Sequence, residues 1–204
     1  MSNVMAAAQP VTLTGERVRL EPLCRDHAAG LLDSARAPEI WRFMNETLDG
    51  PAAVERWIES GLKANAAGTD NVFVIVEQAT GRVIGSTRYL DIRAAHRGLE
   101  IGWTWLAKDQ WRNGVNTECK FLLLQHAFEA TGAIRVQLKT HRLNFRSRQA
   151  IERIGAQFEG ILRNAVIMPD GTFRDSAYYS VIDAEWPAVR RHLLLMMDGQ
   201  REPA

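Results

Sequence analysis

Hydrophobic and polar residues alternate with two different periods along the chain, and these periods predict its helices and strands. Residues 51–66 carry apolar side chains at helical spacing, whereas residues 72–78 and 83–92 alternate with period two around a Thr80-Gly81 turn and predict a hairpin. The expected strands are 16–20, 72–78, 83–92, 98–106, 134–138 and one on each side of the turn at 168–171. The expected helices are 24–35, 39–45, 51–66, 115–130, 144–154 and a last one from Asp183 to about Gly199.

The order of these elements predicts the fold class. Between residues 98 and 140 a strand is followed by a helix and a second strand, which indicates a parallel crossover inside a mixed sheet. We therefore expect an α/β (α+β) fold, with helices packed over a central sheet. With no internal repeat or long linker, the chain predicts one domain at 11–198, a flexible N-terminal tail at 1–10 and a C-terminal tail at 199–204.

Composition narrows the classes of protein that fit. The chain has 204 residues, of which 46% are hydrophobic, and this suits a single domain. Its 25 Lys and Arg against 24 Asp and Glu give a net charge of +1, so we expect no nucleic-acid partner. No apolar run is long enough for a membrane span, and two cysteines fit a reducing, cytoplasmic location. The five histidines lack metal-like spacing, so no metal is expected.

The segment 105–118 carries the first chemical signal. A strand runs into a polar turn with one glycine and then opens a helix, whose free N–H groups and dipole form an anion site. Arg112 adds a positive charge there, and Asn116 or Thr117 is expected to cap the helix. The alternative is an ordinary loop with a solvated arginine. The turn is neither a Walker loop nor a dinucleotide fingerprint, because the lysine and the further glycines of those motifs are absent.

The segment 140–156 carries the second signal. Asn144 and Ser147 stand at the start of a helix, where capping is their ordinary role. The arginines in this segment predict either a solvated helix face or a surface that receives a phosphorylated ligand; they are Arg142, Arg146, Arg148 and Arg153.

At these two segments the sequence resembles the GNAT superfamily of acyl-CoA N-acetyltransferases, and most closely its branch of ribosomal-protein N-terminal acetyltransferases, over residues 13–195. The family hallmark is Gln or Arg, two residues, Gly, one residue, then Gly or Ala. Here Trp111 takes the first position, Gly114 agrees, and Asn116 takes the last. The resemblance implies a mixed, mostly antiparallel sheet that splays between its fourth and fifth strands, with helices on both faces.

The resemblance also implies roles for individual residues. Asn144 and Ser147 match the family's signature after the fifth strand, but Ile151 stands where a tyrosine acid is common, so Ser147 inherits the place facing the coenzyme sulfur. Glu100 stands where relatives place a carboxylate that takes the amine proton. Its other reading is a surface carboxylate paired with Arg88 or Arg97. His96 and His141 are further candidate bases, although a loop and a strand end are typical of exposed or structural histidines.

Coenzyme and acceptor sites follow from the same likeness. We expect acetyl-CoA as cosubstrate, held by Trp105, Leu106, Arg112, Asn113, Gly114, Val115, Asn116, Thr117, Asn144 and Ser147. The expected acceptor residues are Trp41, Phe43 and Arg88, although aromatic residues at such positions are usually core.

The leading hypothesis from the sequence is an acetyl-CoA-dependent N-acetyltransferase that moves an acetyl group to a primary amine of a small molecule or peptide. The amine attacks directly in a ternary complex. The rival is a catalytically silent coenzyme A-binding sensor or scaffold. A homodimer remains open.

Overall fold

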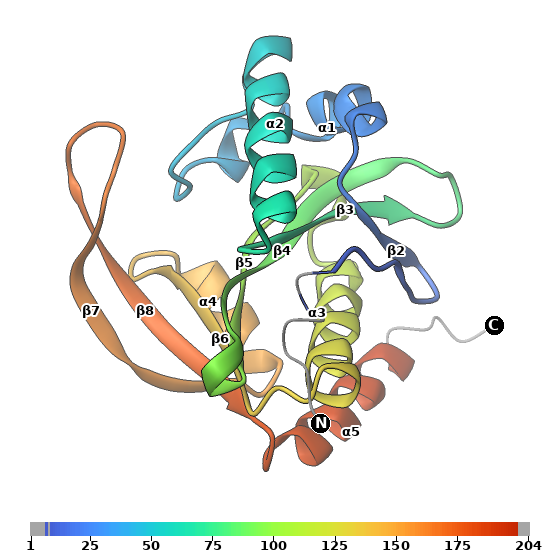
Figure 1. Cartoon of the computed structure of the whole chain (residues 1–204), viewed down its shortest axis with the longest axis vertical. Coiled ribbons are helices and arrows are strands. Elements are labelled where there is room, and N and C mark those ends of the chain that lie inside the picture. The colour runs from blue at the N-terminus through green and yellow to red at the C-terminus, as the bar shows by residue number, and fades with distance from the viewer. Residues whose placement is uncertain (1–6, 8, 200–204) are drawn as a thin grey trace.

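The computed structural model describes residue 7 and residues 9–199, and it contains one eight-stranded open sheet (Figure 1). The strand order is β1-β2-β3-β4-β5-β6-β8-β7, and of these neighbours only β5 and β6 run parallel. The mixed, mostly antiparallel sheet is therefore confirmed. The strands are β1 (Leu13–Thr14), β2 (Val18–Pro22), β3 (Asn71–Glu77), β4 (Val83–Arg93), β5 (Gly98–Leu106), β6 (Arg135–His141), β7 (Gln157–Ile167) and β8 (Phe173–Ile182).

The parallel pair β5 and β6 holds together over only three positions. Gly98 lies opposite Arg135, and the pairing ends where Glu100 lies opposite Gln137. Beyond that point β5 continues against β4 as far as Leu106, while β6 continues against β8. The two strands separate and leave their facing edges without ladder partners, which confirms the splay predicted between the fourth and fifth expected strands.

A bulge lies on the part of β5 that has left β6. Ser86 pairs with Trp105 and Arg88 pairs with Gly102, so Trp103 and Thr104 together face the single residue Thr87. Trp103 has a left-handed backbone, with φ of 51°. An extra residue bends and twists a strand and breaks its alternation. The regular alternation expected through residues 98–106 is therefore wrong beyond Gly102.

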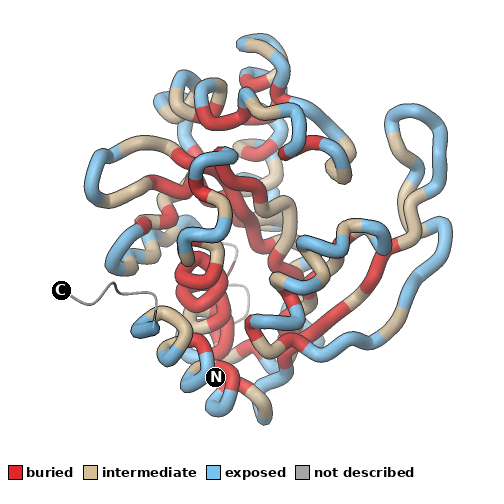
Figure 2. The backbone as a smooth tube through the Cα atoms, turned by 180° about the vertical axis from the view of Figure 1, so that it is seen from behind, coloured by how far each residue is buried: buried red, intermediate tan, exposed pale blue. Residues whose placement is uncertain are grey.

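Helices cover both faces of the sheet, as expected, because the central strands are apolar on both faces. In β3, Val72 and Val74 pack into a core with the first two helices, whereas Phe73 and Ile75 pack into a core with the third. Figure 2 shows the resulting burial concentrated in the central strands and the helix across them. The α-helices are α1 (Ala28–Ser34), α2 (Pro51–Ala67), α3 (Val115–Gln125), α4 (Phe145–Arg153) and α5 (Trp186–Asp198).

Three helix boundaries differ from the sequence expectation. The helix expected at 39–45 is only a 3₁₀ turn, Pro38–Ile40, because the indole Nε1 of Trp41 turns back and donates to the Ala35 carbonyl at 2.8 Å. The helix expected to run to residue 130 changes to a π-helix at His126–Ala130. The last helix starts at Trp186 rather than near Asp183, since the Asp183 N–H continues the sheet by donating to Ile134.

The predicted tails fall largely outside the described residues, so the domain boundaries stay a prediction. Within the described part, the carbonyls of Ala7 and Gln9 accept hydrogen bonds from the side-chain amide of Asn71. None of the described helices combines the length and the apolar character that crossing a membrane requires.

Candidate functional site

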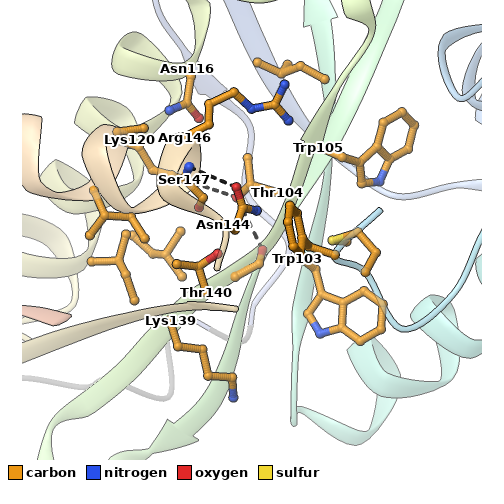
Figure 3. A pocket seen from close by; sticks show the side chains of 18 of the residues that line it. Trp103, Thr104, Trp105, Asn116, Lys120, Lys139, Thr140, Asn144, Arg146 and Ser147 are labelled. Carbon is orange, nitrogen blue, oxygen red and sulfur yellow. Dashed lines mark hydrogen bonds between the residues drawn. The ribbon is translucent and has the colours of Figure 1, made fainter. Parts of the chain in front are cut away.

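A cavity of about 560 Å³ lies where β5 and β6 separate (Figure 3). Its walls come from both strands, from α3 and α4, from the loop after Ile40 and from β8. This volume lies in the range of ordinary small-molecule sites, about 300–1,000 Å³.

The cavity collects many of the residues predicted from the sequence. Those that line it are Phe43, Glu100, Trp105, Leu106, Arg112, Asn116, Asn144 and Ser147. Predicted residues that do not line it are Trp41, Arg88, Asn113, Gly114, Val115 and Thr117.

The two predicted acceptor residues outside the cavity have structural surroundings. Trp41 is buried against Trp105, with ring centroids 5.3 Å apart. Arg88 is buried with its guanidinium carbon 4.8 Å from the ring centroid of Trp103, and its Nη1 lies 3.1 Å from Asp70. Arg88 therefore packs behind the bulge of β5.

The turn before α3 exposes backbone donors. Arg112 and Gly114 both have left-handed backbones, with φ of 66° and 90°, and Gly114 is the N-cap. No acceptor in the described chain takes the backbone N–H of Arg112, Asn113, Gly114 or Asn116. Successive free N–H groups at a helix start form an anion-binding concavity. The expected side-chain cap by Asn116 or Thr117 is wrong, because Asn113 Oδ1 instead accepts from the Val115 N–H at 3.2 Å.

Two arginines approach this turn from different elements. Arg146 of α4 lies with its guanidinium carbon 3.6 Å from the ring centroid of Trp111. Partial desolvation, followed by the like charge of Arg112, lowers the pKa of Arg146. An anion bound between the two guanidinium groups would relieve this repulsion. Trp111, which departs from the family hallmark, thus supplies an aromatic platform for a cation from another helix.

The arginine run of segment 140–156 divides between two environments. Arg146 and Arg153 line the cavity, and Arg153 Nη2 lies 3.5 Å from Thr117 Oγ1 at the start of α3. Arg142 pairs with Asp175, and Arg148 donates to the hydroxyl of Tyr179 at 2.8 Å. The run therefore divides into two arginines at the cavity and two bound to other side chains, and binding of a phosphorylated ligand stays a prediction.

The start of α4 separates the roles of Asn144 and Ser147. Asn144 is the N-cap, and its Oδ1 accepts the Ser147 backbone N–H at 3.1 Å. The Ser147 hydroxyl has no hydrogen-bond partner among the described residues and belongs to the cavity wall. The hydroxyl does not cap the helix, so the capping role expected for Ser147 is wrong; its backbone N–H is the donor that Asn144 caps.

Glu100 is 1% exposed and sits at the last paired position of β5. Its Oε2 accepts from Gln137 Nε2 at 2.9 Å and lies 3.1 Å from Lys139 Nζ, both on β6. The alternative pairing with Arg88 or Arg97 is wrong, because Arg97 binds the Gly132 carbonyl instead. Oε1 accepts no hydrogen bond from a described residue and lies beside Gly102, a cavity residue.

Lys120 is a cavity residue that the sequence analysis missed. It is 6% exposed, and its Nζ donates to Thr104 Oγ1 at 2.6 Å, which in turn lies 2.8 Å from Thr87 Oγ1 (Figure 3). Burial lowers the pKa of Lys120 to about 8. The sequence does contain a signal for this residue, because Lys120 is a single lysine between Cys119 and the apolar run Phe121–Leu124. A charged side chain in such a run is rarely buried unless it contacts a polar partner or a cavity.

The remaining candidate bases lie elsewhere. His96 is exposed. His141 Nδ1 accepts the Leu143 N–H, and the ring centroids of His141 and Phe43 are 5.1 Å apart. Partial burial, followed by the charges of Arg174 and Arg142, lowers the pKa of His141. Among the described residues no group of three His, Cys, Asp or Glu side chains is arranged to hold a metal ion.

Comparison with known proteins identifies relatives of this chain in sequence and in fold. The family model described as the Acetyltransferase (GNAT) domain matches residues 17–157. A GCN5-related N-acetyltransferase from Brucella melitensis is 31% identical, with a TM-score of 0.85 over 92% of this chain and 85% of that one. The protein named "Putative ribosomal N-acetyltransferase YdaF" of Bacillus subtilis is 32% identical over 52% of this chain.

The chain spans little more than half of the length of two relatives from Bacillus subtilis. The matched segment is 57% of YdaF's own length and 60% of that of the N-acetyltransferase YoaA from the same organism. The Mycobacterium smegmatis RimJ structure in complex with CoA-disulfide has a TM-score of 0.80 at 22% identity, over 94% of this chain and 96% of that one, and so shares the fold.

The lowered pKa of Lys120 predicts a pH-dependent stability. Between about pH 8 and 10.5 the unfolded chain holds the Lys120 proton that the folded chain has released, so the free energy of unfolding rises with pH in this window. Below pH 8 the desolvation cost is fully present. We expect Lys120→Met to stabilise the protein at pH 7 by up to about 3 kcal/mol, an advantage that shrinks towards pH 10.

Urea unfolding at several pH values measures this effect, and Lys63→Met, at an exposed lysine of α2, is the control. The same stability difference at pH 7 and pH 10 would show that Lys120 does not titrate as described.

Proposed function

Because this chain belongs to the GNAT acetyltransferase family, we propose that it transfers an acetyl group from acetyl-CoA to a primary amine bound beside Glu100. One observation carries the proposal. Arg112 and Asn116, at the two ends of the turn with free backbone donors, line the same cavity as the buried carboxylate of Glu100, and this cavity lies where β5 and β6 separate. Such an arrangement suits a cosubstrate with phosphates at one end and a reacting thioester at the other.

The residues at the turn fit the phosphates of coenzyme A. The free N–H groups between Arg112 and Asn116 would donate to the pyrophosphate, and Arg146 would add its charge from α4. The edge of β5 beyond Glu100 has no ladder partner on the side of β6, so its peptide groups are available to the pantetheine arm. These contacts would fix the thioester near Ser147.

The chemistry needs little beyond positioning and one proton acceptor. Acetyl-CoA supplies a thioester, whose carbonyl carbon forms the new N–C bond while the C–S bond breaks. Glu100 Oε1, which no described donor occupies, would take the proton of the ammonium and leave the nitrogen lone pair free. Lys139 and Gln137 hold the other carboxylate oxygen and so fix its direction.

Ser147 would serve the leaving group. Its hydroxyl faces the cavity without a partner and can donate to the developing thiolate, a contact that strengthens as the charge develops. A protein that binds coenzyme A without transferring its acetyl group would use the same turn but would have no need of these two side chains. A transfer assay with a library of amines and N-terminal peptides therefore tests the proposal.

Removing the base should lower turnover. We expect Glu100→Gln to reduce kcat by about 100-fold while the affinity for acetyl-CoA changes little, because general base catalysis contributes about 100-fold or more. Glutamine keeps an oxygen for Lys139 and Gln137, so folding should survive. Glu159→Gln, at an exposed carboxylate paired with Arg135, is the control. Wild-type turnover in Glu100→Gln would assign the proton to water or another group.

The glycine of the turn should control coenzyme affinity. Gly114 has φ of 90°, so Gly114→Val would strain the backbone and redirect the free N–H groups. We expect coenzyme A to bind about tenfold more weakly, a loss of about 1.4 kcal/mol. Gly81→Val is the matched control, because Gly81 has a similar φ of 71° in the β3–β4 turn. Equal affinity in a folded Gly114→Val protein, measured by calorimetry, would exclude this turn.

Ser147 should affect chemistry rather than folding. Its backbone makes the capping contact, so Ser147→Ala keeps the cap and loses only the hydroxyl. We expect a melting temperature near wild type and turnover lower by about tenfold, the effect of one hydrogen bond of about 1.4 kcal/mol.

Asn144→Ala is the comparison, because it removes the cap and should cost about 1 kcal/mol of stability. A destabilised but fully active Ser147→Ala protein would leave the thiolate without this donor.

A further inference from the structure

Arg174 is a cation of the cavity that pairs with no carboxylate among the described residues, and it lies on β8, away from the turn before α3. It lies on β8 opposite Val166 of β7, and both residues line the cavity. Its Nη1 donates to Asn45 Oδ1 at 3.4 Å, and its Nε is buried without a hydrogen-bond partner. A half-buried guanidinium with an unsatisfied donor is costly, and such groups are usually satisfied by a ligand or by a second residue.

The balance of charge around the cavity is strongly positive. Glu100 is the single acid among the described lining residues, and the cations are Arg112, Lys120, Lys139, Arg146, Arg153 and Arg174. Lys139 is paired with Glu100, and Lys120 donates to Thr104. The arginines of α4 and of the turn surround the proposed phosphate site. Among the arginines of the cavity, Arg174 is the one that lies away from the proposed phosphate site and has no carboxylate paired with it.

The position of Arg174 points to the acceptor. Desolvation lowers the pKa of Arg174, and the charge of Glu100 offsets this only in part, so the two groups lie within electrostatic reach. The contact with Asn45 places Arg174 against the loop that carries Phe43, at a wall of the cavity distinct from the turn before α3. A bound amine beside Glu100 would therefore have this guanidinium nearby.

We infer that the acceptor is a primary amine that also carries a carboxylate. The ammonium lies against Glu100, and the carboxylate lies against the guanidinium group of Arg174 at the cavity wall. The inference rests on the proposed function, because it names the acceptor class of the same site. Arginine binds carboxylates in a two-point contact that neutral or cationic acceptors cannot make. A polyamine would instead bring a second positive charge towards Arg174 and Lys139.

Matched pairs of acceptors test this directly. One arm compares β-alanine with β-alaninamide, and the other compares peptides of serine followed by aspartate or by asparagine, with amidated C-termini. Rates are corrected for the fraction of neutral amine. We expect kcat/KM to favour the carboxylate member by about 10- to 100-fold, the effect of one charged hydrogen-bonded contact. A preference in the β-alanine pair indicates a free amino acid as acceptor, and a preference in the peptide pair indicates an acidic peptide.

The variants assign the preference to a residue. In Arg174→Gln the ratio of carboxylate to amide should fall towards one. Arg142→Gln should keep the wild-type ratio, because Arg142 pairs with Asp175 and does not line the cavity. An unchanged ratio in Arg174→Gln, or equal rates for both members in the wild type, would overturn the inference while leaving the proposed function intact.

Absence of transfer to every acceptor would count against the proposed function itself. Calorimetric titration of the protein saturated with coenzyme A then decides the inference separately. Tighter binding of β-alanine than of its amide, lost in Arg174→Gln, supports it, and equal binding overturns it.

Discussion

The limited pairing of β5 with β6 is the constraint on which the rest of the structure depends. Two parallel strands that stayed paired would satisfy each other's peptide groups and close the sheet. Here the ladder between β5 and β6 ends after Glu100, and a bulge at Trp103 and Thr104 interrupts the pairing of β5 with β4 just beyond that point. The cavity lies at the gap so created, and the edge of β5 that borders it has peptide groups without a ladder partner on the side of β6, where we propose that the pantetheine arm binds.

The same separation explains why a buried carboxylate stands at this place. Glu100 is the last residue of β5 that pairs with β6, so its side chain is surrounded by packed strands and also lines the cavity. Lys139 and Gln137 reach it from β6 across the gap and satisfy one of its oxygens. A carboxylate held in this way keeps one oxygen for a substrate, and Arg174 provides the opposite charge at the acceptor wall.

Periodicity and motifs in the sequence predicted the helices and strands well, but they did not predict which residues each side chain contacts. The bounds expected for residues 98–106 match β5, and residues of the turn and of the start of α4, which carried the two chemical signals, line the cavity. The bulge was not predictable, because an extra residue is recognised only against the partner strand. Arg88 was assigned to the acceptor, but strand geometry turns it towards Trp103 and Asp70. Arg174 was missed because the sequence does not state which strand borders the gap. Lys120 was missed although a lysine inside the apolar run of α3 was a signal, because the sequence does not state which side of the helix faces a cavity.

The like charges of Arg112 and Arg146 near the turn have a practical consequence for work with the purified protein. Because Arg112 and Arg146 repel in the absence of an anion, any multivalent buffer anion should occupy the space between them. Sulfate, citrate or phosphate in the storage solution would then raise the melting temperature and also compete with the coenzyme. Affinities measured in such buffers would be understated, and a chloride or acetate buffer of low ionic strength would give values nearer those of the protein alone.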